Sequence, residues 1–383
     1  MSKTWITNAR VVSPGLDLDK AAVCIAGGKI ESVVAAEAEV PEGAEAYDAR
    51  GAMLVPGFID IHTHGANGFD TNAGAKEQVA GMAEAKVREG VTTFFPTTLT
   101  LPTDQLEGIV AAAAAYGAAP THAKAPRLHI EGPFINPECV GAQNPEFVRK
   151  PDVAVIDRLR EIAPIGIVSV AVEMEGGVDF VAAMKERGIR TSLAHTAATY
   201  ADFIAAKEAG LNHLTHFCNQ MTGLHHREIG CVGAGLLDPD IRIELICDKI
   251  HLCPDMLKLV WTLKPVDQLM IITDSMSASW LDDGVYDLGG LEVHVTDRQA
   301  RLANGALAGS TALYYEEFHN VLEVTGLPAS EVVAATSWNQ AQSLGIEGVG
   351  RIEVGFTADL ALLDPSDGHR PVAVWVDGER KFG

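Results

Sequence analysis

Apolar residues in the middle of the chain occur in short runs, and helical spacing follows many of them, as in residues 78–89, 104–115 and 201–209. Eight of these runs are rich in apolar and β-branched residues and predict strands. They are residues 57–64, 91–98, 127–133, 166–173, 190–196, 213–219, 242–248 and 269–275. Such strands are typical of a parallel sheet that is covered on both faces. Eight strand–helix units in succession predict an α/β fold, a (β/α)8 barrel of the TIM type.

The two ends of the chain follow a different pattern. Short β-branched runs separated by turn residues fill the first 53 residues and recur at residues 358–364 and 372–379. This similarity predicts that both termini meet in one small β-sandwich. We therefore expect residues 1–53 and 346–383 to form the β-sandwich and residues 54–345 to form the barrel.

Composition narrows the classes of partner. The chain is 47% hydrophobic and 21% charged, as in an ordinary soluble globular protein. Its formal net charge of −22 argues against nucleic acid or an anionic membrane as a partner, because both require a basic surface. Neither an apolar signal core nor a run of about 18 apolar residues occurs, so we expect a cytoplasmic protein. The six cysteines contain no Cys-x-x-Cys pair, which argues against a disulfide framework.

Polar residues that can bind metals stand at the C-terminal end of nearly every predicted strand. In a barrel these ends meet at one mouth, where barrel enzymes carry their chemistry. His62 and His64 end the first strand, and residues i and i+2 of a strand point to the same face, so both imidazoles could bind one ion. The other members of this set are Glu131, Glu173, His195, His216, Asp248 with His251, and Asp274. Carboxylates and imidazoles gathered in one ring repel one another unless a cation lies among them.

Five of these residues form a ligand set without thiolate, namely His62, His64, Glu131, His195 and His216. Nitrogen and oxygen ligands suit zinc or a similar first-row ion. Glu131 could bridge two adjacent ions. Each residue alone could instead be a hydrogen-bonded structural residue, but their common placement favours a metal centre. We expect one or two divalent ions per chain, with zinc favoured and iron, manganese or cobalt as alternatives.

Asp274, at the end of the eighth strand, is the candidate general acid and base, and it is also placed to join the metal ligands. A metal ion lowers the pKa of its bound water to about 7, and a nearby carboxylate can take that proton and return it to a leaving nitrogen. The alternative is an aspartate that caps the next helix. His251 follows the seventh strand and could polarise the scissile carbonyl or hold the substrate.

Two loops are candidates for substrate binding. In residues 219–230, Arg227 stands beside His225 and His226 and suits bidentate phosphate recognition, although it could equally pair with Glu228 in a solvated loop. The loop of residues 136–150 is long and rich in Gly, Pro and Asn, which is typical of a lid or substrate loop. Its Gln143 could contact the substrate.

These motifs resemble the amidohydrolase superfamily and, within it, the N-acetylglucosamine-6-phosphate deacetylase family. The resemblance extends over residues 56–65, 129–134, 193–196, 214–221, 226–228, 273–275, 307–310 and 350–360. Glu-Gly-Pro-Phe at 131–134 is the most specific motif, because many relatives use a carboxylated lysine where this family uses Glu.

The resemblance implies a metal-dependent deacetylase with Glu131, His195 and His216 as ligands. It also implies Asp274 as general base and acid, His251 on the carbonyl and Arg227 on the phosphate of a neighbouring subunit, hence a homodimer. Further substrate contacts would come from Gln143, Asn219, Gln220 and His226.

The expected reaction removes the N-acetyl group of N-acetylglucosamine 6-phosphate and gives glucosamine 6-phosphate and acetate. The alternatives are another N-acetylated amino sugar or a cyclic amide, or a non-catalytic assembly protein with the same fold. Such assembly proteins typically lose metal ligands, and none is missing here.

The chain departs from the family pattern at three positions. Gln143 replaces a usual histidine, Lys249 replaces glycine in an Asp-Gly-x-His motif, and Gln220 replaces alanine in Asn-Ala-Met. All three fall on positions expected to face the substrate rather than the metal. We therefore expect the hydrolytic chemistry to be kept, while the sugar stays open.

Overall fold

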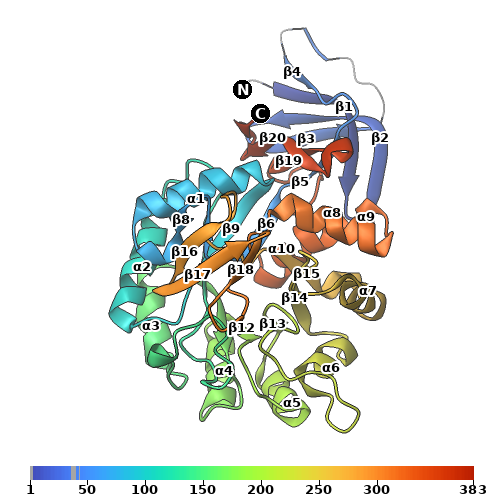
Figure 1. Ribbon diagram of the computed structural model, residues 1–383. Helices are drawn as coiled ribbons and strands as arrows, with labels where there is room; N and C mark the ends of the chain where they lie inside the picture. Colours follow the sequence, from blue (N-terminus) through green and yellow to red (C-terminus); the bar gives the residue numbers. More distant parts are fainter. Residues whose placement is uncertain (1–2, 36–39, 43) are drawn as a thin grey trace.

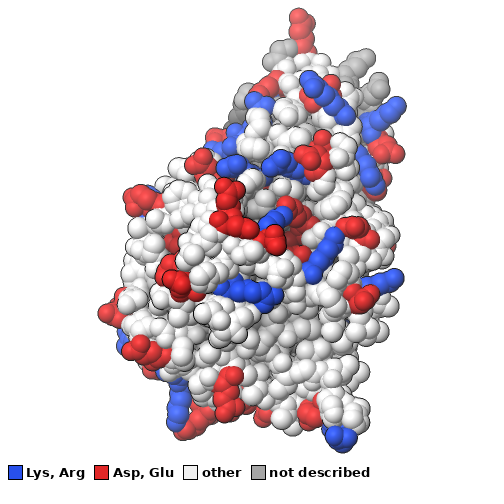
Figure 2. Space-filling view, viewed as in Figure 1, with Lys and Arg blue, Asp and Glu red and all other residues white. Residues whose placement is uncertain are grey.

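The computed structural model describes residues 3–35, 40–42 and 44–383. A barrel surrounded by helices makes up most of the molecule, and a β-domain that contains both termini lies at one end of it (Figure 1). On the face shown in Figure 2, Lys and Arg side chains lie singly or beside acidic ones. No helix among the described residues is long and apolar enough to cross a membrane.

Eight parallel strands form the barrel, and their order around it follows the chain. They are β6 (Phe58–Thr63), β9 (Val91–Thr98), β10 (Leu128–Ile130), β11 (Ile165–Val170), β12 (Arg190–Leu193), β13 (His213–Leu214), β14 (Arg242–Ile246) and β15 (Leu269–Ile272). A parallel bridge between Thr63 and Ser275 brings the last strand beside the first. The predicted (β/α)8 barrel is confirmed, with all eight strands at the predicted places.

Most of these strands end earlier than the apolar runs suggest. At three strand ends the backbone turns into the left-handed region, at His195 (φ 46°), His216 (φ 29°) and Asp274 (φ 48°). A non-glycine residue in this region costs roughly 1–3 kcal/mol, and such residues cluster at functional sites. The chain therefore leaves the strand at the residues that carry the candidate chemistry.

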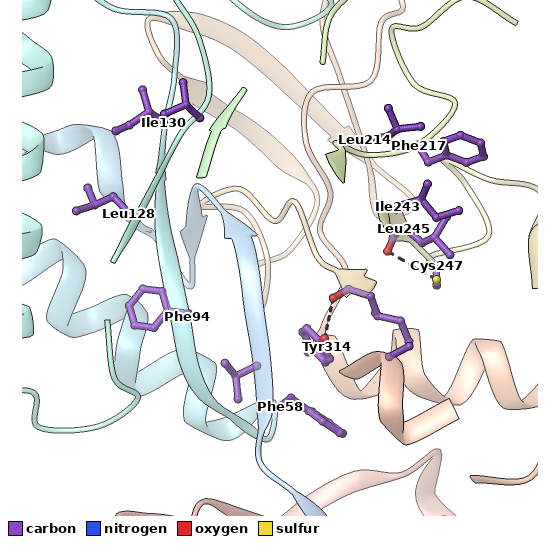
Figure 3. Close-up of a cluster of buried hydrophobic side chains, with 14 of the residues drawn as sticks. Phe58, Phe94, Leu128, Ile130, Leu214, Phe217, Ile243, Leu245, Cys247 and Tyr314 are labelled. Atoms are coloured by element: carbon purple, nitrogen blue, oxygen red, sulfur yellow. Dashed lines mark hydrogen bonds between the residues drawn. The ribbon is translucent and has the colours of Figure 1, made fainter. Parts of the chain in front are cut away.

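Helices cover the outside of the barrel (Figure 1). They are α1 (Lys76–Arg88), α2 (Thr103–Gly117), α3 (Val153–Ile162), α4 (Gly177–Glu186), α5 (Tyr200–Ala209), α6 (Gly230–Leu237), α7 (Pro254–Leu263), α8 (Tyr314–Thr325), α9 (Ala329–Val332) and α10 (Trp338–Leu344). Buried side chains such as Phe94 and Leu128 fill the main core (Figure 3). The Tyr314 hydroxyl donates a 2.8 Å hydrogen bond to Ile271 O and so ties α8 to β15. A smaller cluster that includes Ile61 and Leu344 packs α10 against barrel strands.

The terminal domain has eight strands drawn from both ends of the chain. They are β1 (Lys3–Ser13), β2 (Leu16–Ala26), β3 (Lys29–Val34), β4 (Glu45–Asp48), β5 (Met53–Pro56), β19 (Leu360–Asp364), β20 (Arg370–Val376) and β21 (Glu379–Phe382). Strands β5 and β19 pair antiparallel and join the two ends of the chain. The strand order is β21-β20-β19-β5-β1-β2-β3, and β4 pairs with β1 outside this order. The domain has its own core, with Ile6 and Val23 from one end and Trp375 from the other. The predicted β-sandwich built from both termini is confirmed, and its boundaries at residues 53 and 346 stay a prediction.

Short elements complete the chain around the barrel mouth. A hairpin of β7 (Gly65–Ala66) and β8 (Phe69–Asp70) follows β6, and a three-stranded antiparallel sheet of β16 (Gly284–Leu288), β17 (Leu291–Thr296) and β18 (Gln299–Arg301) follows β15. This sheet was not predicted from the sequence. The alternating exposed and buried positions of β17 mark it as half-buried rather than part of the barrel. The six cysteines, all among the described residues, are free.

Candidate metal centre at the barrel mouth

A cavity of about 170 Å³ opens at the C-terminal ends of the barrel strands. Most of the predicted site residues line it, namely His64, Glu131, Gln143, His195, His216, Asn219, Gln220, His251 and Asp274. Leu99, Leu288 and Leu307 add apolar walls. A larger cavity of about 560 Å³ includes Asp248, Arg298 and Arg370 in its lining, but the lining residues include none of the predicted metal ligands. We therefore place the candidate chemistry in the smaller cavity.

The first group of metal-competent atoms lies at the end of β6. His62 Nε2 is 3.4 Å from His64 Nε2, and Asp274 Oδ1 is 3.3 Å and 3.2 Å from these two nitrogens. Glu131 approaches the same nitrogens, with Oε1 3.5 Å from His62 and Oε2 3.2 Å from His64. All four residues are buried. Two carboxylates and two imidazoles thus converge on one point.

The second group shares Glu131 with the first. Its Oε1 lies 3.1 Å from His216 Nε2 and 3.4 Å from His195 Nε2, and the two nitrogens are 3.2 Å apart. An ion held by these three donor atoms would keep one tetrahedral coordination position open, as in catalytic zinc sites. Glu131 belongs to both groups, with Oε1 near nitrogens of each group and Oε2 beside His64.

The positions of the protons on the histidine rings favour a cation between these donor atoms. The outer nitrogens of His64 and His195 face backbone carbonyls, with Nδ1 3.2 Å from Thr97 O and 2.8 Å from Cys139 O. Because a carbonyl only accepts, both Nδ1 atoms carry protons, and in the neutral ring the Nε2 lone pairs point inward. These nitrogen lone pairs face carboxylate oxygens, and the two kinds of atom repel each other unless a cation lies between them.

The spacing of the donors also suits a metal ion. In a tetrahedral site with bonds of roughly 2.0–2.2 Å, donor atoms lie roughly 3.3–3.6 Å apart. The nitrogen–nitrogen and nitrogen–oxygen distances given above for the two groups lie between 3.1 Å and 3.5 Å. The residues present therefore fit a divalent metal ion, and their nitrogen and oxygen atoms do not select one metal.

The charges of this cluster shift its pKa values strongly. Burial alone lowers the pKa of an imidazole, but Asp274 and Glu131 outweigh burial and raise the pKa of His64 to about 9. The pKa of His62 is likewise raised well above its ordinary range, against burial, by the charges of Glu131 and Asp274. Burial raises the pKa of a carboxyl group, yet His62 and His64 lower that of Asp274 to about 2. In the metal-free protein the cluster thus holds protons that an ion displaces on binding.

His251 reaches the cavity from the loop after β14. Its Nδ1 lies 2.8 Å from Asp248 Oδ2, and the backbone N–H groups of Ile250 and His251 donate to Asp248 Oδ1. Asp248, which sequence reasoning grouped with the rim, therefore orients His251. With Nδ1 committed to Asp248, Nε2 is the nitrogen left to contact a substrate.

Glu173, another member of the predicted rim, lies away from both donor groups. Its carboxylate accepts hydrogen bonds from Asn136 Nδ2 at 2.7 Å and Ala197 N at 2.6 Å, and from the Thr196 hydroxyl. These contacts tie the loop after β10 to the loop after β12. Glu173 is thus a structural residue of the rim.

Gln143 lines the cavity and also contacts a candidate metal ligand. Its Nε2 donates to Glu131 Oε2 at 2.7 Å, and its Oε1 accepts from Thr100 N at 2.7 Å. The sequence predicted only a substrate loop here and not the contact with Glu131.

The other two residues that depart from the family pattern both have a left-handed backbone. Gln220 (φ 48°) also lines the cavity, and the side chain of Lys249 (φ 65°) forms an ion pair with Glu323.

His226 and Arg227 are exposed and are absent from the described lining of the cavity. They contact each other, with Arg227 Nη1 2.7 Å from His226 Nε2. Within the described part of the chain, Arg227 forms no ion pair with a carboxylate. This pair therefore lies on the surface of its own chain.

A buried charged group behind the candidate metal centre was also not predicted from the sequence. Lys86 on α1, fully buried, lies 3.0 Å from Asp60 Oδ2, 3.2 Å from Glu89 Oε2 and 2.9 Å from Ser275 Oγ. It joins α1 to β6 and to the end of β15, the two segments that carry His62 and Asp274. The sequence signal for this contact was Asp60, a charged residue inside the apolar run before His62.

Comparisons with known proteins agree with this geometry. A family model described as the amidohydrolase family matches residues 53–382. The chain is 33% identical to the N-acetylglucosamine-6-phosphate deacetylase of Lysinibacillus sphaericus, over 94% of this chain and 93% of the relative. It is 35% identical to the N-acetylgalactosamine-6-phosphate deacetylase of Escherichia coli O157:H7, over 91% and 92%.

Solved structures give the same picture. The crystal structure of N-acetylglucosamine-6-phosphate deacetylase from Thermotoga maritima matches with a TM-score of 0.88 and 34% identity over 99% of both chains. A mutant of the Mycobacterium smegmatis N-acetyl-D-glucosamine-6-phosphate deacetylase, in complex with N-acetyl-D-glucosamine-6-phosphate, matches with a TM-score of 0.93 and 29% identity over 100% of both chains.

Proposed function

Since this chain belongs to the amidohydrolase family, we propose that it hydrolyses the acetamide bond of N-acetylglucosamine 6-phosphate to give glucosamine 6-phosphate and acetate. The observation that carries the proposal is the pair of donor groups that share Glu131 at the barrel mouth, beside Asp274 and His251. Relatives with deacetylase activity on sugar phosphates, similar over most of the chain, support the substrate class.

Two sets of residues would hold divalent metal ions, for which zinc is our first choice. Glu131, His195 and His216 would hold one ion. The second position would use His62 and His64 with Glu131 and Asp274. When bound, the metal polarises the amide carbonyl and lowers the pKa of water.

Asp274 is the general base and then the general acid. Its carboxylate lines the cavity, and in the metal-free protein the charges of His62 and His64 lower its pKa to about 2. It takes a proton from the attacking water and passes it to the amide nitrogen as the C–N bond breaks. His251, oriented by Asp248, contacts the substrate at or near the acetyl carbonyl through Nε2.

Gln143, Asn219 and Gln220 are placed to bind the sugar, because all three line the cavity. Arg227 and His226 would bind the phosphate of a neighbouring subunit, since they are exposed and are absent from the described lining of their own cavity. The proposal therefore includes a homodimer with phosphate sites completed across the interface. A cytoplasmic location is also part of it.

N-acetylgalactosamine 6-phosphate is the second candidate substrate. The similarity to the Escherichia coli O157:H7 deacetylase, at 35% identity, favours it. The two sugars differ only in the orientation of one hydroxyl group, so the side chains of the cavity wall decide between them. Gln143 and Gln220 are the residues in that wall that depart from the family pattern.

Acetate release from four compounds tests the proposal. These are the 6-phosphates of N-acetylglucosamine and N-acetylgalactosamine and the two unphosphorylated sugars, each given to the zinc-loaded protein. We expect turnover of a phosphorylated sugar and at least a tenfold lower kcat/KM without phosphate. Equal rates with and without phosphate would remove the role of Arg227, and no acetate from any of them would overturn the proposed function.

A further inference from the structure

Two buried polar atoms face each other beneath the candidate metal centre, and neither has a hydrogen-bond partner among the described residues. They are His62 Nδ1 and Glu244 Oε2, 3.6 Å apart, in side chains with no solvent exposure. Buried polar atoms without a partner are rare in folded proteins. An approach of roughly 0.4–0.9 Å brings such a pair to the ordinary hydrogen-bond distance. Each atom is therefore the natural partner of the other.

Glu244, on β14, belongs to a chain of polar contacts whose direction follows from its chemistry. Glu244 Oε1 lies 3.2 Å from His213 Nδ1, and His213 Nε2 lies 2.5 Å from Ser343 Oγ on α10. A carboxylate only accepts hydrogen bonds, so His213 donates through Nδ1, and its Nε2 accepts from the Ser343 hydroxyl. The second oxygen of Glu244 is left to accept a proton from His62 Nδ1.

His62 is the one imidazole of the metal centre whose outer nitrogen faces a charged group. The corresponding nitrogens of His64 and His195 face backbone carbonyls, and His216 Nδ1 has no partner among the described residues. A carboxylate behind an imidazole fixes the tautomer and raises the basicity of the opposite nitrogen. Among these four rings, His62 is therefore the one whose Nε2 is made the strongest metal-binding atom.

The same residues could be mistaken for a separate metal site, because His62, His129 and Glu244 lie close together. His129, however, has both ring nitrogens engaged: Nδ1 is 3.1 Å from Ile61 O, and Nε2 is 2.8 Å from Ser169 Oγ. The Nδ1 proton goes to the carbonyl and Nε2 accepts from the serine hydroxyl, so no lone pair is free. Glu244 therefore serves His62 rather than an ion of its own.

We propose that Glu244 is a positioning residue of the metal position built on His62 and His64. It holds His62 with the proton on Nδ1, so that the Nε2 lone pair points toward Glu131 and Asp274, and its charge strengthens this ligand. The inference rests on the proposed function, because it requires an ion at His62 and His64.

Glu244→Gln tests the proposal by removing the charge while keeping the shape. Glu317→Gln is the control for replacing a buried carboxyl group by an amide, since Glu317 is also without solvent exposure but accepts from Cys247 N and contacts no candidate ligand. Titration with Zn²⁺ against a competing chelator measures each ion separately. We expect E244Q to bind the second Zn²⁺ roughly 10- to 100-fold more weakly and the first as before, and E317Q to bind both like wild type. Wild-type affinity for both ions in E244Q would overturn the proposal.

Nitrogen-15 NMR of the histidines gives a second readout, which needs only the zinc-loaded wild-type protein if E244Q does not fold. We expect His62 to bind zinc through Nε2 and to show a downfield, slowly exchanging Nδ1 proton that moves upfield in E244Q alone. Zinc on Nδ1, or an Nδ1 proton without the downfield shift, would contradict the role of Glu244. If wild type and H62Q/H64N hold the same number of ions, the second metal position itself is overturned.

Discussion

Gln143 donates a 2.7 Å hydrogen bond to Glu131 Oε2, the oxygen that also faces His64 Nε2 at 3.2 Å. The opposite end of the Gln143 amide accepts from Thr100 N, so the side chain is fixed at both ends. The carboxylate shared by the two donor groups is thereby held by the loop that follows β10. A single contact thus joins the loop of residues 136–150 to a candidate metal ligand.

Gln143→Ala should therefore weaken metal retention as well as catalysis. A hydrogen bond to a charged group contributes roughly 1.5–3 kcal/mol, so we expect a loss of roughly 10- to 100-fold in kcat/KM together with faster zinc removal by a chelator. Gln220→Ala is the control, because Gln220 lines the same cavity without a hydrogen bond to a candidate ligand. Unchanged chelation kinetics in Q143A would leave Gln143 as a substrate contact only.

Asp274→Asn should abolish most of the turnover and leave the fold intact. The amide cannot take a proton from water, and the loss of general acid–base catalysis typically costs roughly 10²–10⁴-fold in rate. The measurement is kcat with metal content determined on the same sample, because Asp274 Oδ1 also lies beside His62 and His64. Near-wild-type turnover with metal still bound would show that another group moves the proton.

Arg227 should act across a subunit interface. Arg227→Ala is expected to raise KM for the phosphorylated substrate roughly 10- to 100-fold, from the loss of a charge-assisted contact, with little change for the unphosphorylated sugar. Co-expression with the D274N chain should then restore about a quarter of wild-type activity, because about half of the dimers are mixed and each has one intact site. Activity no higher than the sum of the two variants would place Arg227 outside the neighbouring site.

Much of the fold could be predicted because the signals are local. Each barrel strand lies in a local segment rich in apolar and β-branched residues, and the candidate ligands stand at the ends of those segments, where barrel topology brings them together. The terminal β-domain was predictable for the same reason, since β1 and β20 each show strand patterning without reference to the other. The deacetylase family could be inferred from contiguous motifs such as Glu131–Phe134.

What could not be predicted depends on contacts between distant residues. Lys86 lies on a helix, and its partner Ser275 is far along the chain. In the sequence Glu244 is only one polar position in a strand, and the closed barrel places it beneath His62. The early ends of β12 and β13 could not be predicted either. Histidine adopts the left-handed conformation only occasionally, and tertiary packing decides that His195 and His216 do so.

The metal-free protein should lose stability as pH rises from about 6.5 to 9. The pKa of His64 is raised to about 9 in the folded state, against burial, by Asp274 and Glu131. A raised folded-state pKa stabilises the protein fully below the unfolded value of about 6.5, and that contribution disappears as pH rises through the folded value. The check is Tm against pH for metal-free wild type and H64N, where the variant should give a flatter profile. A Tm that rises over this interval in wild type alone would contradict the assignment.

Lys86→Met should destabilise the protein more than any surface substitution. Removing one partner of a buried ion pair leaves an uncompensated charge, here Asp60 and Glu89 in side chains with no exposure, and typically costs roughly 3–5 kcal/mol. Denaturant unfolding of the metal-free protein measures the change. In the double variant K86M/E89Q one of the two stranded charges is gone, so it should recover part of the loss. A K86M protein within about 1 kcal/mol of wild type would mean that water or a rearranged side chain compensates Asp60, and that α1 does not depend on this contact to hold β6 and the end of β15 in place.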